Sequence, residues 1–157
     1  RVLVARLDEL EREQPNCRGV LLDGFPRNRA QAEALDRVLR ERGDDLVAVI
    51  HLDVPREALI ERLSGRLVCQ QCGATYHRTF NPPRQPGICD RCGGPLIQRS
   101  DDTPEAIARR LDIYEEQTAP LLEYYRQRSL LIDIDGDRSI DEVSRSILAA
   151  LAPRLGA

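Results

Sequence analysis

The 157-residue chain is long enough for one domain with a core, and its hydrophobic (41%) and charged (31%) fractions are ordinary for a globular protein. The formal net charge of -3 gives no overall basic field that would indicate nucleic-acid binding. No apolar stretch approaches a membrane span, and no signal-peptide pattern opens the chain. We therefore expect a cytoplasmic protein with neither a membrane nor a nucleic-acid partner, and a monomer as its simplest state.

The start of the chain reads as the continuation of a longer pattern. Residues 2–14 have the apolar spacing of an amphipathic helix already under way, ended by Pro15. The sequence contains no methionine and no lysine, so all 23 basic residues are arginine. We expect that an N-terminal piece precedes Arg1; a processed natural terminus is the alternative.

Apolar runs and helical spacings alternate along the remaining chain. Short apolar runs predict buried strands at residues 20–22, 46–54 and 130–134. Helical spacing predicts helices over 28–42, from Pro55 to about 64, from Thr103-Pro104 with a bend near Pro120, and after Gly136. This alternation indicates an α/β fold with a parallel sheet covered by helices on both faces. Three strands are few for such a sheet, so we expect one or two more in the preceding piece.

Four cysteines form a metal-binding pattern within a segment rich in glycine and proline, residues 66–100. Cys69 and Cys72 make one C-x2-C pair, and Cys89 and Cys92 make a second after sixteen residues. Four thiolates complete a closed tetrahedral Zn²⁺ site with no open position, which predicts a structural metal. Two disulfides or a redox dithiol are the alternatives. Because the segment has few large apolar residues, the metal would replace a core, and the segment could move as a rigid lid.

A polar segment follows the first expected strand. Asp23 would end that strand, where α/β domains bind ligands, and an acid there can hold the water ligands of Mg²⁺. A turn cap is the alternative for Asp23, because Asp-Gly favours turns. Gly24 and Pro26 restrict the backbone before Arg27, and Gln31 lies one helical turn beyond, so Arg27 and Gln31 could meet one ligand.

Arginines flank both stems of the cysteine segment. Arg62 and Arg66 precede it, Arg99 follows it, and Arg109-Arg110 lie on the next helix. A solvated surface would explain any one of them. Together, beside a strand-end acid, they predict a site for multiply charged phosphates, because phosphoryl transfer depends on positioning and charge stabilisation.

With these features the sequence resembles the adenylate kinase family, in its long bacterial form with a zinc-bearing lid. The resemblance runs along essentially the whole chain. The resemblance is clearest in four segments: LLDGFPRNRAQAEAL (21–35), GRLVCQQCGATYHRTFNPPRQPGICDRCGG (65–94), QRSDDTPEAIARRL (98–111) and TAPLLEYY (118–125). It implies a nucleoside monophosphate kinase core of the P-loop type, incomplete here, at residues 1–65 and 104–157, with an inserted zinc-ribbon-like lid at 66–103.

The resemblance also implies a reaction, ATP + AMP ⇌ 2 ADP with Mg²⁺, and a role for each matching residue. AMP would be bound by Gly24, Phe25, Pro26, Arg27, Gln31, Arg99 and Arg110. ATP would be bound by Arg62, Arg66, Thr75, Tyr76 and Arg138. Catalysis would depend on Asp23, Arg62, Arg66, Arg99 and Arg110, while Asp101 and Asp102 would pair with lid arginines on closure and Arg109 would lie on the surface.

One departure from the family is serious. The chain has no lysine and no G-x-x-x-x-G-K-[ST] phosphate loop. The helical AMP-binding lobe that follows this loop in the family is also missing from the sequence. We therefore expect a fragment, and we expect the isolated 157 residues to have no useful kinase activity.

Two other functions remain open. A zinc-ribbon module that binds nucleic acid fits the cysteine spacing and the arginines, but not the net negative charge or the 4% aromatic content. A nucleoside monophosphate kinase with another acceptor base is the second alternative; Gln31 and the lid favour AMP.

Overall fold

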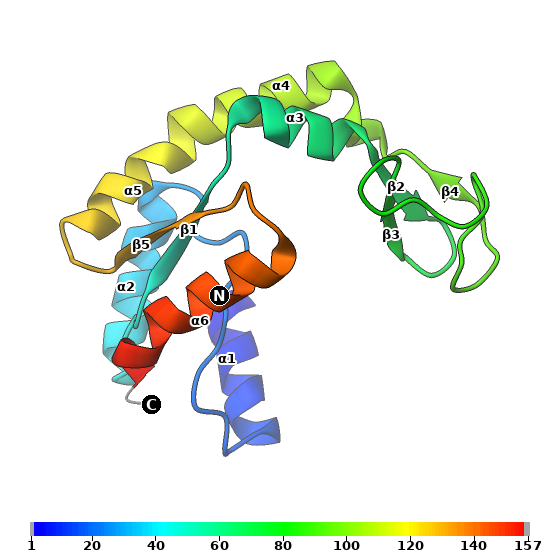
Figure 1. The fold of residues 1–157 in the computed structure, drawn as a ribbon. Helices are drawn as coiled ribbons and strands as arrows, with labels where there is room; N and C mark the ends of the chain where they lie inside the picture. The colour runs from blue at the N-terminus through cyan, green and yellow to red at the C-terminus, as the bar shows by residue number, and fades with distance from the viewer. Residues whose placement is uncertain (1, 156–157) are drawn as a thin grey trace.

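A two-stranded parallel sheet lies at the centre of the larger part of the molecule, in a computed structural model that describes residues 2–155 (Figure 1). Strand β1 (Val49–Asp53) pairs with β5 (Leu131–Asp135), with Val49 opposite Leu131 and Asp53 opposite Asp135. In Figure 1, α6 (Ile140–Leu155) lies in front of the sheet and α2 (Arg29–Arg42) behind it. The expected α/β fold with helices on both faces of a parallel sheet is therefore confirmed.

Local capping chemistry sets the ends of α2. The Asn28 side chain accepts a hydrogen bond from the Gln31 backbone N–H, which satisfies one of the free donors of the first turn. At the other end Gly43 has a φ of 74°, a left-handed conformation that glycine adopts without strain. Arg42, at the end of α2, then donates to Asp8 and Glu11 of α1 (Val2–Glu13), and so ties the first helix to the domain.

A small core joins α2 to the sheet through α5 (Ala119–Arg126). Its buried members are Ala32, Leu121 and Tyr125, and Val49 and Leu131 of the two strands pack against them. The core therefore fixes the sheet to the helical layer behind it.

The helix after the cysteine segment bends where the sequence predicts. α4 (Pro104–Ile113) continues through a π-helical turn, Tyr114–Thr118, into α5. The ring of Pro120 would clash with the carbonyl of the residue four positions earlier, so a widened turn before it relieves the clash. The bend places α4 beside α3 (Arg56–Ser64), and the two helices together carry the cysteine lobe away from the sheet (Figure 1).

The strand expected at residues 20–22 is wrong. No strand forms there; Val20 is 48% exposed and Leu21 91% exposed. A strand needs a neighbour to receive its backbone hydrogen bonds, and β1 and β5 pair only with each other within residues 2–155. Asp23 therefore follows a segment that forms no strand, and it does not lie at a strand end.

The cysteine lobe contains a small antiparallel sheet that sequence reasoning did not anticipate. β2 (Arg66–Cys69) is central, between β3 (Thr75–His77) and β4 (Leu96–Ile97). These strands are two to four residues long, too short for an alternating pattern. Over residues 2–155, no helix is both long and apolar enough to cross a membrane.

Candidate metal centre and phosphate-binding site

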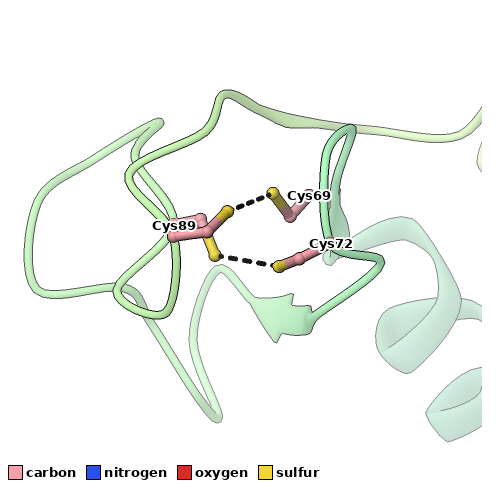
Figure 2. Close-up of side chains that lie close together, drawn as sticks. Cys69, Cys72 and Cys89 are labelled. Atoms are coloured by element: carbon pink, nitrogen blue, oxygen red, sulfur yellow. Dashed lines mark hydrogen bonds between the residues drawn. The ribbon is translucent and has the colours of Figure 1, made fainter.

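The four cysteines come together as two equivalent turns. In the first, the Gly73 N–H donates to the Cys69 carbonyl at 3.1 Å; in the second, the Gly93 N–H donates to the Cys89 carbonyl at 2.8 Å. Gly73 and Gly93 have φ values of 71° and 74°, so glycine lets each turn fold back tightly. The two turns face each other across the lobe (Figure 2).

The four sulfurs fit one tetrahedral ion. Sγ of Cys69 lies 3.4 Å from Sγ of Cys92, and Sγ of Cys72 lies 3.6 Å from Sγ of Cys89. All four sulfurs lie within 4.8 Å of one another. A tetrahedral site with metal–sulfur bonds of 2.3 Å has sulfurs about 3.8 Å apart. The predicted metal-ligating residues are therefore brought together as a group that could hold a metal ion.

Neighbouring groups push the thiol pKa values apart. The Tyr76 hydroxyl, 3.5 Å from Cys89 Sγ, lowers the pKa of Cys89 to about 6. A hydrogen bond from the Cys72 backbone lowers the pKa of Cys69. The Gly94 amide favours the Cys92 thiolate, but the sulfurs of Cys72 and Cys69 outweigh it and raise that pKa to about 12. The Cys92 thiol thus resists ionising beside the neighbouring sulfurs, and a divalent cation would remove that resistance.

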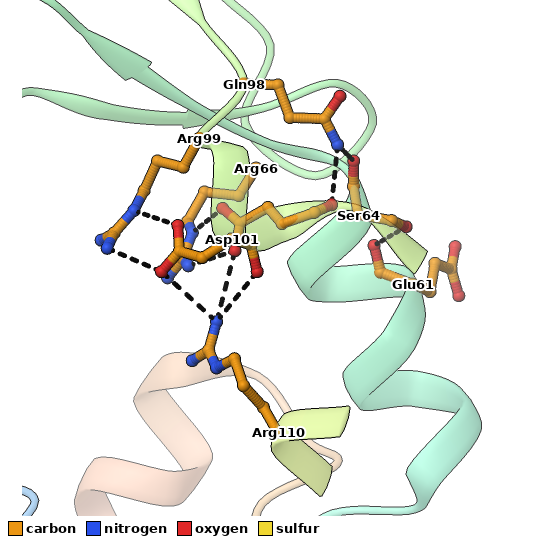
Figure 3. A network of polar contacts seen from close by, with 8 residues as sticks. Glu61, Ser64, Arg66, Gln98, Arg99, Asp101 and Arg110 are labelled. Carbon is orange, nitrogen blue, oxygen red and sulfur yellow. Dashed lines mark hydrogen bonds and ion pairs between the residues drawn. The ribbon is translucent and has the colours of Figure 1, made fainter. Parts of the chain in front are cut away.

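A second site lies where the lobe joins the two helices (Figure 3). Asp102 is fully buried and receives two hydrogen bonds from Arg66, at 2.8 Å from Nε and 2.6 Å from Nη2. Arg110 Nη1 lies 3.5 Å from Asp102 Oδ1. A buried carboxylate needs such partners, because an unpaired charge in the interior is costly.

Asp101, the next carboxylate, holds a third arginine. Arg99 donates to it twice, from Nε and from Nη2, both at 2.8 Å. These hydrogen bonds lower the pKa of Asp101, so the pair stays charged at neutral pH. Two adjacent carboxylates therefore gather Arg66, Arg99 and Arg110 at the stem of the lobe. The expected pairing of Asp101 and Asp102 with lid arginines on closure stays a prediction.

Gln98 joins this cluster to the end of α3. Its Nε2 donates to the Ser64 carbonyl at 3.0 Å and to the Asp102 carbonyl at 2.9 Å (Figure 3). Sequence reasoning did not single out Gln98, because one of its acceptors, Ser64, is distant along the chain and the other, Asp102, is reached only through a tight turn. Only the adjacent Arg99 pointed to this position.

Arg62 and Arg138 lie at the end of β5 instead. Arg62 donates to the Gly136 carbonyl at 2.9 Å and to Asp137 at 2.7 Å, while Arg138 donates to Asp135 at 2.7 Å. The residues expected to bind ATP are thus spread over three places: Arg66 at the lobe stem, Thr75 and Tyr76 within the lobe, and Arg62 and Arg138 at the carboxyl end of the sheet. Tyr76 has its hydroxyl on Cys89, where it also accepts the Asp90 N–H at 2.9 Å, and Thr75 is exposed.

The segment expected to bind AMP is folded on itself before α2. Arg27 Nε donates to the Gly24 carbonyl at 2.7 Å, and the Arg27 N–H donates to the Gln31 side chain at 2.8 Å. The contact to Gln31 is made by the backbone of Arg27, while the Arg27 guanidinium turns back to Gly24, so the expectation that both side chains meet one ligand stays a prediction. Phe25 and Pro26 are half-buried between them, and Asp23 is exposed. Arg109, expected on the surface, is exposed.

The structure thus combines an α/β domain with a small lobe that is inserted between two of its helices, has arginines at both stems and carries four cysteines that could hold a metal ion. The family model described as adenylate kinase matches residues 2–130. The chain belongs to the adenylate kinase family.

Curated relatives agree with this assignment. The chain is 61% identical to the adenylate kinase of Moorella thermoacetica over 139 residues, which cover 88% of this chain and 64% of that protein. It is 57% identical to the adenylate kinase of Carboxydothermus hydrogenoformans over 151 residues, 96% of this chain and 70% of that protein. It is 54% identical to that of Caldanaerobacter subterraneus subsp. tengcongensis over 145 residues, 92% and 65%. The chain spans about two thirds of the length of these relatives.

Proposed function

We propose that the full-length protein carrying this chain is an adenylate kinase, which transfers the terminal phosphoryl group of ATP to AMP and forms two ADP. The observation that carries the proposal is the gathering of Arg66, Arg99 and Arg110 around Asp101 and Asp102 at the stem of the lobe. Membership of the adenylate kinase family and the names of the curated relatives support it.

The arginine cluster would act by exchanging partners. Without nucleotide, Arg66 and Arg99 each present a two-pronged fork to a carboxylate. A phosphate group accepts the same fork, so nucleotide phosphates would compete with Asp101 and Asp102 for these guanidinium groups. Arg99 and Arg110 would then stabilise the charge that develops on the transferring phosphoryl group. Arg62 and Arg66 would bind the ATP phosphates.

The remaining nucleotide contacts follow from position. Gly24, Phe25, Pro26, Arg27 and Gln31 would bind AMP, and Thr75, Tyr76 and Arg138 would bind ATP. Asp23 would orient the water ligands of Mg²⁺, which supplies charge neutralisation between the phosphates when it is bound with ATP.

The metal of the lobe would be zinc with a structural role. Four cysteine thiolates favour Zn²⁺ and leave no position for a reacting water. Residues 66–103 would form the lid, and residues 1–65 and 104–157 would belong to the core. A cytoplasmic monomer acting on small nucleotides fits these proposals.

The test is a coupled assay of the purified full-length protein with ATP, Mg²⁺ and each of AMP, GMP, CMP and UMP. We expect ADP formation with AMP at a kcat/KM at least about 100-fold above that with the other acceptors, the discrimination that unpaired base-edge groups produce. Preference for another acceptor would replace the proposal with a different nucleoside monophosphate kinase, and no turnover with any acceptor would refute it. The 157-residue chain alone, which has no phosphate-loop lysine, is expected to give no turnover.

A further inference from the structure

His77 accepts two backbone N–H groups on a single ring nitrogen. Its Nδ1 lies 3.0 Å from the Thr79 nitrogen and 3.1 Å from the Phe80 nitrogen. A ring nitrogen that accepts hydrogen bonds carries no proton. The contacts therefore fix the ring as neutral imidazole with its proton on Nε2.

The opposite side of the ring lies against the end of α3. Nε2 lies 3.4 Å from the Glu61 carbonyl oxygen, an acceptor that suits the protonated nitrogen. Gly65 follows α3, and a Cβ placed there would lie 2.2 Å from Nε2. The ring thus occupies the space that a side chain at position 65 would need, and Phe80 stacks on it with centroids 4.5 Å apart.

This contact lies at the base of the lobe. In the antiparallel pairing of β2 and β3, His77 is opposite Arg66, and the Arg78 N–H donates to the Gly65 carbonyl at 2.9 Å. Arg62, in the last turn of α3, and Arg66, at the start of β2, lie on either side of Gly65 along the chain. The position of the His77 ring is therefore linked to the positions of both arginines.

We propose that His77 is a positioning residue that holds the base of the lobe against α3 while its ring is neutral, and so sets the placement of Arg62 and Arg66. Its consequence for nucleotide binding rests on the proposed kinase function.

Protonation of His77 Nδ1 is incompatible with the two hydrogen bonds that this nitrogen accepts. A proton on Nδ1 would point at two N–H donors, so the turn through Thr79 and Phe80 would lose both hydrogen bonds. The charged residues nearest to this contact along the surrounding elements are Glu61 and Arg62 on α3, Arg66 on β2 and Arg78 beside the ring. Three of these four are cations, which do not favour a further positive charge.

The first test measures the tautomer and the turn in the metal-loaded full-length protein at pH 8. Side-chain ¹⁵N chemical shifts should show a proton on Nε2 and none on Nδ1. The protection factors of the Thr79 and Phe80 amides should fall about tenfold in His77→Ala and His77→Gln, because two hydrogen bonds are lost. His77→Asn should keep them, because an Asn Oδ1 accepts from the same amides in an Asx turn.

Gly65→Ala tests the same contact without replacing His77. The added methyl group should push the His77 ring out of its position and lower the protection factors of the Thr79 and Phe80 amides. A proton found on Nδ1, or protection that His77→Ala and Gly65→Ala leave unchanged, would overturn the proposal whether or not the protein is a kinase.

The second test measures the KM for ATP of the parent, His77→Ala, His77→Asn and Gly65→Ala at a single pH. In the kinase assay, the KM for ATP should rise in His77→Ala and Gly65→Ala and return toward the parent value in His77→Asn. A KM for ATP that stays at the parent value in both His77→Ala and Gly65→Ala would contradict the positioning of Arg62 and Arg66.

Discussion

At the scale of single residues, the contacts of Arg66, Arg99 and Arg110 show why arginine suits the stem of the lobe. Asp102 is fully buried, and one guanidinium satisfies both of its oxygens at once. Lysine, as a point charge on a flexible stem, would satisfy the same carboxylate without fixing its orientation. The fork that holds the carboxylate is also the shape that binds a phosphate.

Replacing Arg99 or Arg110 by alanine in the full-length protein tests the catalytic role that we propose for them. We expect kcat to fall about 100- to 1,000-fold, because charge stabilisation in the transition state is lost. Arg109→Ala is the matched control: it removes an exposed arginine beside Arg110 and should leave kcat unchanged. Steady-state kinetics measure the effect; a raised KM with an unchanged kcat in both variants would assign these arginines to ground-state binding only.

Tyr125 gives a prediction on stability. Its ring is 2% exposed, and its hydroxyl is buried with no hydrogen-bond partner among residues 2–155. Burial raises the pKa of this phenol to about 12, so the hydroxyl stays protonated. Tyr125→Phe should therefore keep or raise the free energy of unfolding, by up to about 1 kcal/mol, because no bond is lost. Chemical denaturation measures it, and a loss above about 1 kcal/mol would mean that the hydroxyl has a partner.

At the scale of elements, a chain of polar contacts joins the sheet to the bend of the long helix. His51 on β1 has Nδ1 2.8 Å from Asp133 on β5 and Nε2 3.1 Å from the hydroxyl of Tyr114, the first residue of the π-helical turn. These contacts hold the turn above the sheet, where the direction of α4 is set.

The Asp133 contact predicts a pH dependence of stability. The hydrogen bond from His51 lowers the pKa of Asp133 below its unfolded value. The contribution of this contact is therefore present above about pH 4, the pKa of an unfolded Asp, and is lost as the pH falls through the folded value. The free energy of unfolding should fall less steeply below pH 4 in His51→Leu than in the parent. Parallel curves in urea titrations over that range would contradict it.

The two sheets predict a separable response to metal removal. The lobe strands have little apolar core beyond the cysteines, whereas β1 and β5 pack on Tyr125 and Leu121. Chelation should abolish amide protection in residues 66–97 and leave β1 and β5 protected, because metal binding would supply the folding energy of the lobe. Hydrogen exchange with mass spectrometry measures both at once. Uniform loss of protection would show that the metal supports the whole chain.

The sequence predicts elements whose signals are local and misses those that depend on a distant partner. Asn28, Gly43 and Thr103 mark helix ends through capping chemistry, and each is found at a helix end. The apolar run at 20–22 has the composition of a strand but no neighbour to pair with in the described residues. The spacing of the cysteines predicts their cluster, whereas nothing local predicts that His77 Nδ1 accepts two amides.

At the scale of the whole molecule, the lobe and the sheet are joined by two antiparallel helical stems, α3 and α4 (Figure 1). The arginine cluster lies at this junction, and Arg62 reaches the end of β5. Movement of the lobe relative to the sheet would therefore move Arg66 and Arg99 relative to Arg62 and Arg138. This arrangement is consistent with the proposed kinase function, in which the lobe would close over the nucleotides as a lid.

The most direct test of the proposed kinase function starts from ADP alone. Phosphorus NMR would follow ADP and Mg²⁺ incubated with the purified full-length protein. We expect ATP and AMP to form in equal amounts until equilibrium, with no free phosphate, because a phosphoryl group passes from one nucleotide to another. Unchanged ADP, or AMP that forms together with free phosphate, would contradict the proposed adenylate kinase function.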